Sequence, residues 1–148
     1  MNQANVRRRS PPIIIGDQDY ERLTRLASAA PPALADAAEE LLREMDRARL
    51  KPQSDIPSNV VRIGSLVTFQ PVSGAVRTVR LVFPGQADIA EGRISVLTPI
   101  GAALIGLAEG QSMSWEDRSG RRHELTVLSV KWPDAPASGD RQVAGAQA

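Results

Sequence analysis

Asp36 and Glu39 are the residues whose types and spacing come nearest to a chemical site. They lie three positions apart in a segment with helical periodicity, so their carboxylates would share one helix face. Carboxylate oxygens bind divalent metal ions, and this pair could share one if a partner supplied the remaining ligands. Acids in the first turns of a helix also stabilise it through the helix dipole. From the residues alone, the helix-stabilising role is favoured.

Other local signatures of catalysis are missing from the sequence. His123 is the only histidine, and in the basic stretch Arg121–His123 we expect a solvent-facing turn residue without metal partners. There is no phosphate-binding loop, dinucleotide fingerprint, zinc-protease motif or nucleophile elbow, and no cysteine for a thiolate site. Serine, lysine and carboxylate chemistry needs no local signature and stays open. We expect a protein that is not an enzyme, without catalytic residues, metal or cofactor.

Composition narrows the class of partner. The chain has 148 residues, with 18 basic against 17 acidic residues and a formal charge of +1. This balance is a poor match for a protein that grips duplex DNA or RNA through many phosphates. No apolar run is long enough for a signal peptide or a membrane span, so we expect a cytoplasmic protein with no membrane contact. Aromatic residues make up only 3%, so the core must be aliphatic.

The first part of the chain has the periodicity of two amphipathic helices. Apolar residues from Tyr20 to Ala30 follow Asp17, the expected N-cap, and Pro31-Pro32 ends this helix. A second helix is expected from about Leu34 to Ala48, with Glu44 among the acids on its polar face. Two helices joined by a short proline turn form an antiparallel hairpin, here residues 13–52. Residues 1–12 are expected to be a flexible arm and 53–59 a linker.

The second part, residues 60–133, has the pattern of a sheet with one short helix, and residues 134–148 have the composition of a disordered tail. Strands are expected at Val60–Ile63, Leu66–Phe69, Arg77–Phe83, Ile94–Leu97, Ser112–Glu116 and Glu124–Trp132. Thr98 is a suitable N-cap, Pro99 fits the first helical position, and Gly106 lies where a helix commonly ends.

Two pairs of side chains stand out in this second part. Trp115 and Trp132 are expected to be core or rim residues of the last hairpin. Arg77 and Arg80 either contact a partner or solvate a strand.

The segment ISVLTPIGAALIGLAEGQSMSW, residues 94–115, is similar to the C-terminal signature of Gre-type bacterial transcript elongation factors. The upstream stretches PPIIIGDQDYERL and EMDRARLKPQSDIPSNVVRIGSLVTF resemble the Rnk-type regulators of nucleoside diphosphate kinase, Gre homologues with a shorter hairpin. The likeness spans residues 13–132. It implies an α+β fold in which a short antiparallel helical hairpin, a coiled coil, precedes an FKBP-like domain with a curved antiparallel sheet and one short helix.

The resemblance also implies a partner and a docking site. Gre factors bind RNA polymerase at the rim of its secondary channel, in part through the turn before the short helix. Here that turn is Leu97, Thr98, Pro99 and Ile100, and Leu97 suggests a more apolar contact. The resemblance therefore implies a monomeric regulator of transcription and of nucleoside diphosphate kinase that binds RNA polymerase, competes with Gre-type factors and makes no sequence-specific contact with nucleic acid.

Gre factors also have two hairpin-tip acids that deliver a metal for transcript cleavage, and Asp36 and Glu39 have the same spacing. Because this hairpin is shorter, we expect occupancy of the channel without cleavage. Gre-like cleavage through these acids is one alternative. Another is an FKBP-like peptide binder or prolyl isomerase, although two Phe, one Tyr and two Trp are few for an aromatic proline pocket.

Overall fold

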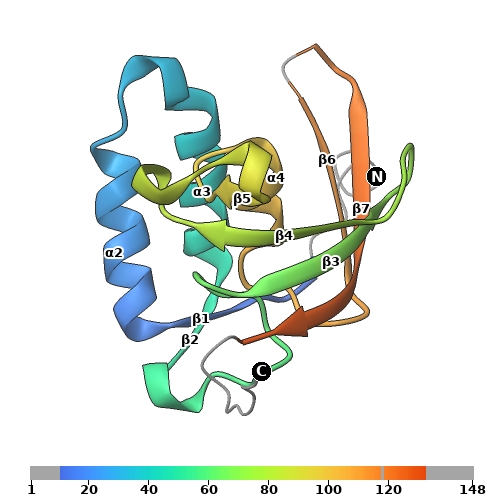
Figure 1. Ribbon diagram of the computed structural model, residues 1–148. Coiled ribbons are helices and arrows are strands. Elements are labelled where there is room, and N and C mark those ends of the chain that lie inside the picture. The colour runs from blue at the N-terminus through green and yellow to red at the C-terminus, as the bar shows by residue number, and fades with distance from the viewer. Residues whose placement is uncertain (1–10, 118, 133–148) are drawn as a thin grey trace, which may run out of the picture.

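The computed structural model describes residues 11–117 and 119–132, and the expected tail and most of the expected arm lie outside these ranges (Figure 1). The α-helices are α2 (Asp17–Ser28), α3 (Ala35–Arg47) and α4 (Pro99–Leu104). The strands are β1 (Ile14–Gly16), β2 (Arg49–Lys51), β3 (Leu66–Pro71), β4 (Arg77–Val82), β5 (Arg93–Ser95), β6 (Ser112–Glu116) and β7 (Arg122–Lys131). Short 3-10 turns lie at Pro32–Leu34, Gln53–Asp55, Pro84–Gln86 and Ile89–Glu91. None of the helices in the described part is long and apolar enough to cross a membrane.

The helical hairpin is confirmed, with one correction at its start. α2 and α3 pack together through apolar stripes that include Leu23, Leu41 and Met45, all buried. Asp17, the expected N-cap, is instead the first residue of α2, because Gly16 occupies the cap position. The Asp17 carboxylate accepts a hydrogen bond from the backbone N–H of Gln53 at 3.1 Å. It therefore joins the hairpin to the segment that follows it.

Glu44 was expected on the polar face of α3, but the structure buries it. Its side chain is only 3% exposed, and one carboxylate oxygen accepts hydrogen bonds from Arg47 Nε at 3.0 Å and Nη2 at 2.7 Å. Arg47 Nη1 also donates to the carbonyl of Pro11. The pair satisfies charges that would otherwise be costly to bury, and it fastens the entering chain to the hairpin.

A short parallel pair, β1 with β2, closes the base of the hairpin and was not expected from the sequence. Ile14 pairs with Arg49 in register, and Arg49 N–H donates to the carbonyl of Ile13 at 2.9 Å. Ile14 N–H donates in turn to the carbonyl of Gly106, just beyond α4. A Cβ at Gly106 would lie 2.8 Å from Cβ of Ile13, and φ there is +83°, so this close approach requires glycine.

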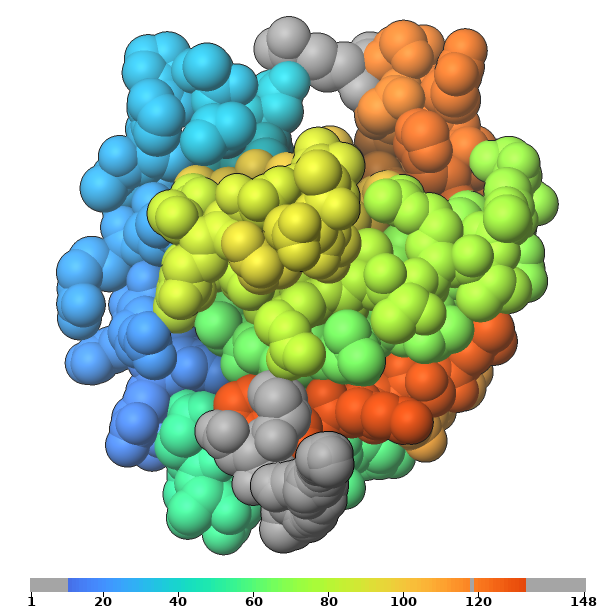
Figure 2. Space-filling view, in the orientation of Figure 1, coloured from blue at the N-terminus to red at the C-terminus, as the bar shows by residue number. Residues whose placement is uncertain are grey.

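The main sheet has strand order β5-β4-β3-β7-β6. The β3–β4, β3–β7 and β6–β7 pairs are antiparallel, as expected, whereas β4 and β5 run parallel. A register shift at Thr68/Phe69 interrupts the β3–β7 ladder, and such irregularities bend strands and increase their twist. The segment between β4 and β5, in yellow, stands out as a ridge in the space-filling view (Figure 2).

The strand expected at Val60–Ile63 is not formed. Val60 makes a single bridge with Ala108, Val61 N–H donates to the carbonyl of Leu107, and Gly106 N–H donates to the carbonyl of Val61. The chain then turns at Arg62, whose N–H donates to Ser65 Oγ at 2.9 Å. The apolar pattern at this point reflects burial against the exit of α4 rather than membership of the sheet.

α4 lies between the hairpin and the sheet, in contact with both α3 and β6 (Figure 1). Its residues Ala102, Ala103 and Leu104 are buried in the same aliphatic core as Phe69 and Val127 of the sheet. The α+β class, with a helical N-terminal part and a curled, mainly antiparallel sheet, is confirmed. One continuous core joins α2 and α3 to the sheet, so packing does not mark a boundary between the two parts. The expected domain boundaries therefore stay a prediction.

Candidate functional site

The corner where β5 leads into α4 is held by a local hydrogen-bond network. Thr98 is the N-cap, with extended backbone, and its Oγ1 accepts from Gly101 N–H at 3.0 Å, as expected. The same hydroxyl donates to the carbonyl of Ser95 at 2.7 Å, and Ser95 Oγ accepts from Leu97 N–H at 2.9 Å. Pro99 occupies the first helical position, where its fixed φ suits the helix. The backbone of this corner is therefore fixed before any partner binds.

The four residues of the expected docking turn differ in exposure. Pro99 is exposed, and Thr98 and Ile100 are half-buried. Leu97 is only 3% exposed and belongs to the aliphatic core. Any contact surface at this corner is therefore made by Thr98, Pro99 and Ile100, while Leu97 supports it from inside.

An apolar groove of about 530 Å³ lies beside this corner. Ile100 and Trp115 line it together with Ile94 of β5 and Ile89. Ile89 comes from the ridge between β4 and β5, and 83% of its surface is exposed. An aliphatic side chain with this exposure, at the edge of a groove lined by further apolar residues, is typical of a binding surface. Two arginines, Arg77 and Arg93, and the polar pair Asp117 and His123 also line the groove.

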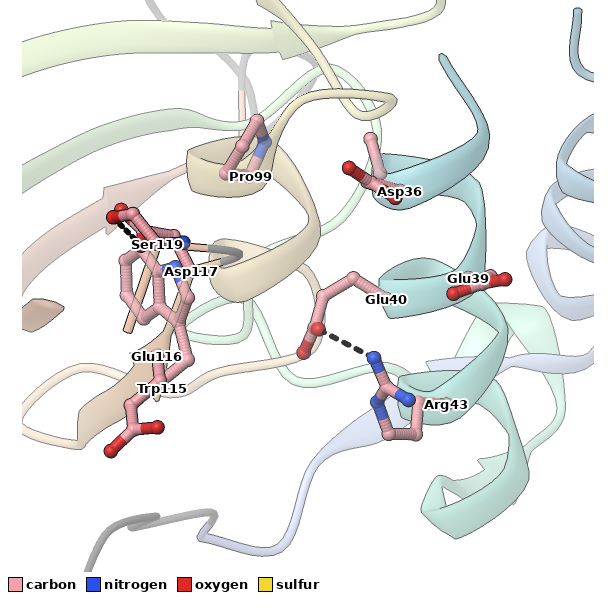
Figure 3. Close-up of a pocket in the computed structure, with 10 residues that line it drawn as sticks. Asp36, Glu39, Glu40, Arg43, Pro99, Trp115, Glu116, Asp117 and Ser119 are labelled. Carbon is pink, nitrogen blue, oxygen red and sulfur yellow. Dashed lines mark hydrogen bonds and ion pairs between the residues drawn. The ribbon is translucent and has the colours of Figure 1, made fainter. Parts of the chain in front are cut away.

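A second hollow, of about 500 Å³, lies on the other side of Pro99, between the corner and α3 (Figure 3). The hairpin contributes five of its lining residues, which are Asp36, Ala37, Glu39, Glu40 and Arg43. The two hollows share Pro99, Trp115 and Asp117. The hairpin and the corner thus form adjoining parts of one surface.

Asp36 and Glu39 are both exposed on the first turns of α3, but they do not converge. In Figure 3 the Asp36 carboxylate lies on the side of α3 that faces Pro99, whereas the Glu39 carboxylate points away from Pro99 and α4. Within residues 11–117 and 119–132, no cluster of three or more His, Asp or Glu side chains is arranged to hold a metal ion. As placed, the two acids do not form one metal site.

Glu40 and Arg43 form the ion pair in this hollow. Arg43 Nη2 donates to Glu40 Oε1 at 3.0 Å, and this hydrogen bond is the main reason that the pKa of Arg43 is raised. The Arg43 side chain is 57% exposed, so solvent screens the interaction and its contribution to stability is small.

His123 is not the solvent-facing turn residue expected from the sequence. It lies in β7, opposite Trp115 of β6, and the two rings stack with centroids 5.2 Å apart. His123 Nε2 is 2.8 Å from Asp117 Oδ2. The hairpin register around residues 117–120 would have revealed this pair, because it sets Trp115 and His123 opposite each other.

Asp117 closes the turn between β6 and β7. Its carboxylate accepts hydrogen bonds from the Ser119 hydroxyl at 2.6 Å, from His123, and from the backbone N–H groups of Ser119 and Arg121. These bonds, the one from the Ser119 hydroxyl first, hold the pKa of Asp117 well below its usual range. Asp117 therefore fastens the turn between β6 and β7.

Comparison with known proteins agrees with this architecture. The family described as Rnk N-terminus matches residues 11–50, and the family described as Transcription elongation factor, GreA/GreB, C-term matches residues 56–132. The Regulator of nucleoside diphosphate kinase from Escherichia coli (strain K12) is 37% identical over 131 residues, which cover 88% of this chain and 96% of that protein.

Relatives named as elongation factors match over less sequence. Transcription elongation factor GreA from Syntrophobacter fumaroxidans is 33% identical over 94 residues, 63% of this chain and 60% of that protein. A solved structure, a prokaryotic transcription elongation factor GreA/GreB from Nitrosomonas europaea, superposes with a TM-score of 0.64 and 31% identity over 83% of this chain and 100% of that one. The chain therefore belongs to the Rnk family and combines an Rnk N-terminus with a C-terminal part of the GreA/GreB type.

Proposed function

We propose that the chain is a non-enzymatic regulator of transcription that binds RNA polymerase at its secondary channel. The corner formed by Thr98, Pro99 and Ile100 docks on the rim, and the hairpin of a single, monomeric copy enters the channel. The chain competes there with Gre-type factors and does not stimulate transcript cleavage. Its relative from E. coli is named for regulation of nucleoside diphosphate kinase, and we extend that regulation to this chain.

The observation that supports the dock most strongly is the exposed Pro99 beside an apolar groove. Thr98 and Ser95 fix the backbone of the corner through hydrogen bonds of 2.7–3.0 Å, so little conformational entropy is lost on binding. Ile100 and the 83%-exposed Ile89 supply apolar surface on the same side. A curled sheet with the single helix α4 against it also supports the FKBP-like arrangement that the family resemblance implies.

The orientation of the hairpin acids supports occupancy without cleavage. Asp36 faces Pro99 while Glu39 points the other way, so the pair does not present one metal ion to a partner (Figure 3). α3 has 13 residues and is therefore about 20 Å long, which limits how far the hairpin can reach. A prolyl isomerase is less well supported, because the aromatic rings lining the groove in the described chain are those of Trp115 and His123.

Substitutions at the corner test the dock. Pro99→Asp places a charge on the exposed contact while Thr98 still caps α4, and we expect affinity for core RNA polymerase to fall by at least about tenfold. Pro57→Asp is the matched control, since Pro57 is also exposed but lies in the linker before the sheet. Equal affinity of the Pro99 and Pro57 variants for core RNA polymerase would show that the corner at Pro99 is not the dock.

Backtracked transcription complexes test the absence of cleavage. The full chain should leave the transcript intact at concentrations at which a Gre factor shortens it. Shortening that disappears in an Asp36→Ala/Glu39→Ala variant would assign the hairpin acids a Gre-like role and overturn this part of the proposal.

A further inference from the structure

Arg80 and Arg93 form a basic pair on the main sheet, and Arg93 also lines the groove beside the corner at Pro99. They are register partners on the parallel strands β4 and β5, so their side chains extend from the same face. Both line a hollow of about 420 Å³ together with Gly64 and Gln86. None of the described residues that line this hollow is acidic.

Both guanidinium groups are held by backbone carbonyls. Arg80 Nη1 donates to Gly64 O at 2.8 Å, and Arg93 Nε donates to Gln86 O at 2.9 Å. Each bond uses one of the five N–H donors of an arginine. Asp88 lies 3.7 Å from Arg93, but both side chains are more than 40% exposed, so this pair is weak. Like charges side by side on neighbouring strands are destabilising, and an anion bound between them would offset that cost.

An adjoining hollow, of about 410 Å³, adds a stacking surface. The two hollows share Ile63. In the second, the Arg62 guanidinium lies over the Trp132 ring, 3.7 Å from its centroid. Nucleic-acid bases stack on aromatic rings and on arginine guanidinium planes. Arg22 also lines this hollow, paired with Asp19 at 3.8 Å, so its charge is partly compensated.

We propose that these two hollows bind a single-stranded nucleic acid without regard to its sequence. Arg80 and Arg93 hold a backbone phosphate, and a neighbouring base stacks on the Arg62–Trp132 pair. An acidic protein surface would satisfy the arginines but would leave the stacking surface unused. A duplex would hide its bases in the helix, and the formal charge of +1 suits a contact with few phosphates. The site adjoins the proposed polymerase dock, because Arg93 also lines the groove beside Pro99, whereas Arg80 and Arg62 do not line that groove.

Fluorescence anisotropy of the full chain with a labelled oligoribonucleotide of about ten nucleotides tests this site at low salt. We expect Arg80→Gln/Arg93→Gln to weaken binding about tenfold or more, and to reduce the salt slope by about 0.7 for each phosphate that the variant no longer neutralises. Arg62→Gln should weaken binding by about fivefold or more because the base stacks less well. Arg49→Gln, the same change at an exposed arginine of β2, should bind as the unchanged chain does.

Four results would overturn the proposal. The first is no binding at tens of micromolar oligonucleotide, and the second is an equal weakening in the Arg49→Gln control. The third is tighter binding of a duplex of the same sequence than of the single strand. If polymerase binding, and not oligonucleotide binding, falls in the arginine variants, the face belongs to a protein contact instead. Thermal unfolding checks that each variant folds. If the double variant does not fold, Arg93→Gln alone replaces it, because the hydrogen bond from Arg93 to Gln86 is exposed and its loss should disturb the fold little.

Discussion

Gly101→Ala tests how closely α4 packs against the strand that precedes it. A Cβ at Gly101 would lie 2.2 Å from the carbonyl oxygen of Ser95 and 2.8 Å from Cα of Val96. Ordinary carbon–oxygen contacts are about 3.3 Å or longer, so the helix and the strand would have to separate by about 1 Å. Both neighbouring atoms belong to the backbone, so no side-chain rotation can relieve the overlap.

The cost follows from that overlap. Overpacking a buried position costs about 1–3 kcal/mol when the surroundings can adjust, and a backbone clash belongs at the upper end of this range. We therefore expect a decrease of about 3 kcal/mol in the free energy of unfolding, and a Tm lower by about 10 °C. Urea and thermal unfolding followed by circular dichroism measure both quantities.

Gly85→Ala is the matched control, because nothing lies within 4 Å of a Cβ built there. We expect the control to be unchanged or to gain up to about 1 kcal/mol from reduced freedom of the unfolded chain. If the free energy of unfolding of Gly101→Ala lies within about 0.5 kcal/mol of that of the unchanged chain, the inferred close packing of α4 is wrong.

Three further substitutions test other contacts. Thr98→Ala should cost about 1 kcal/mol in unfolding experiments, and Thr98→Ser, which keeps the hydroxyl, should recover most of it. Arg47→Ala should cost about 2 kcal/mol because it removes the two hydrogen bonds that Arg47 donates to the buried Glu44 carboxylate, whereas Arg43→Ala, at an exposed pair, should cost less than about 1 kcal/mol. Asp117 has a lowered pKa in the folded chain, so its stabilisation is present above about pH 4, the unfolded value, and is lost as the pH falls toward the folded value. Amide hydrogen exchange of the β6–β7 turn should accelerate over that acid range, and Asp117→Asn should remove the pH dependence; an identical profile in the variant would contradict the assignment.

The features predicted correctly from the sequence depend on neighbouring residues. Thr98, Pro99 and Gly106 mark the start and end of α4 through their own hydroxyl, ring and backbone freedom. The apolar periodicity of α2 and α3 likewise indicates a hairpin, since each stripe needs a partner to cover it. Signals of this kind are contained within a few residues.

Features that depend on distant residues were missed. The pairing of Ile14 with Arg49 and the parallel pairing of Arg80 with Arg93 join segments with no shared local pattern. The burial of Glu44 follows from its hydrogen bonds to Arg47 rather than from its polarity. For the site, residue spacing allowed Asp36 and Glu39 to share a metal ion, although the helix-stabilising role was favoured, and their carboxylates diverge in the structure (Figure 3).

Binding to core RNA polymerase in competition with a Gre factor tests the central proposal most directly. The full chain, titrated onto core polymerase, should bind at micromolar concentration or below, and an excess of Gre factor should displace it. Displacement in both directions would indicate a shared site on the polymerase. No binding at micromolar concentration, or binding that a saturating Gre factor leaves unchanged, would contradict a dock at the secondary channel.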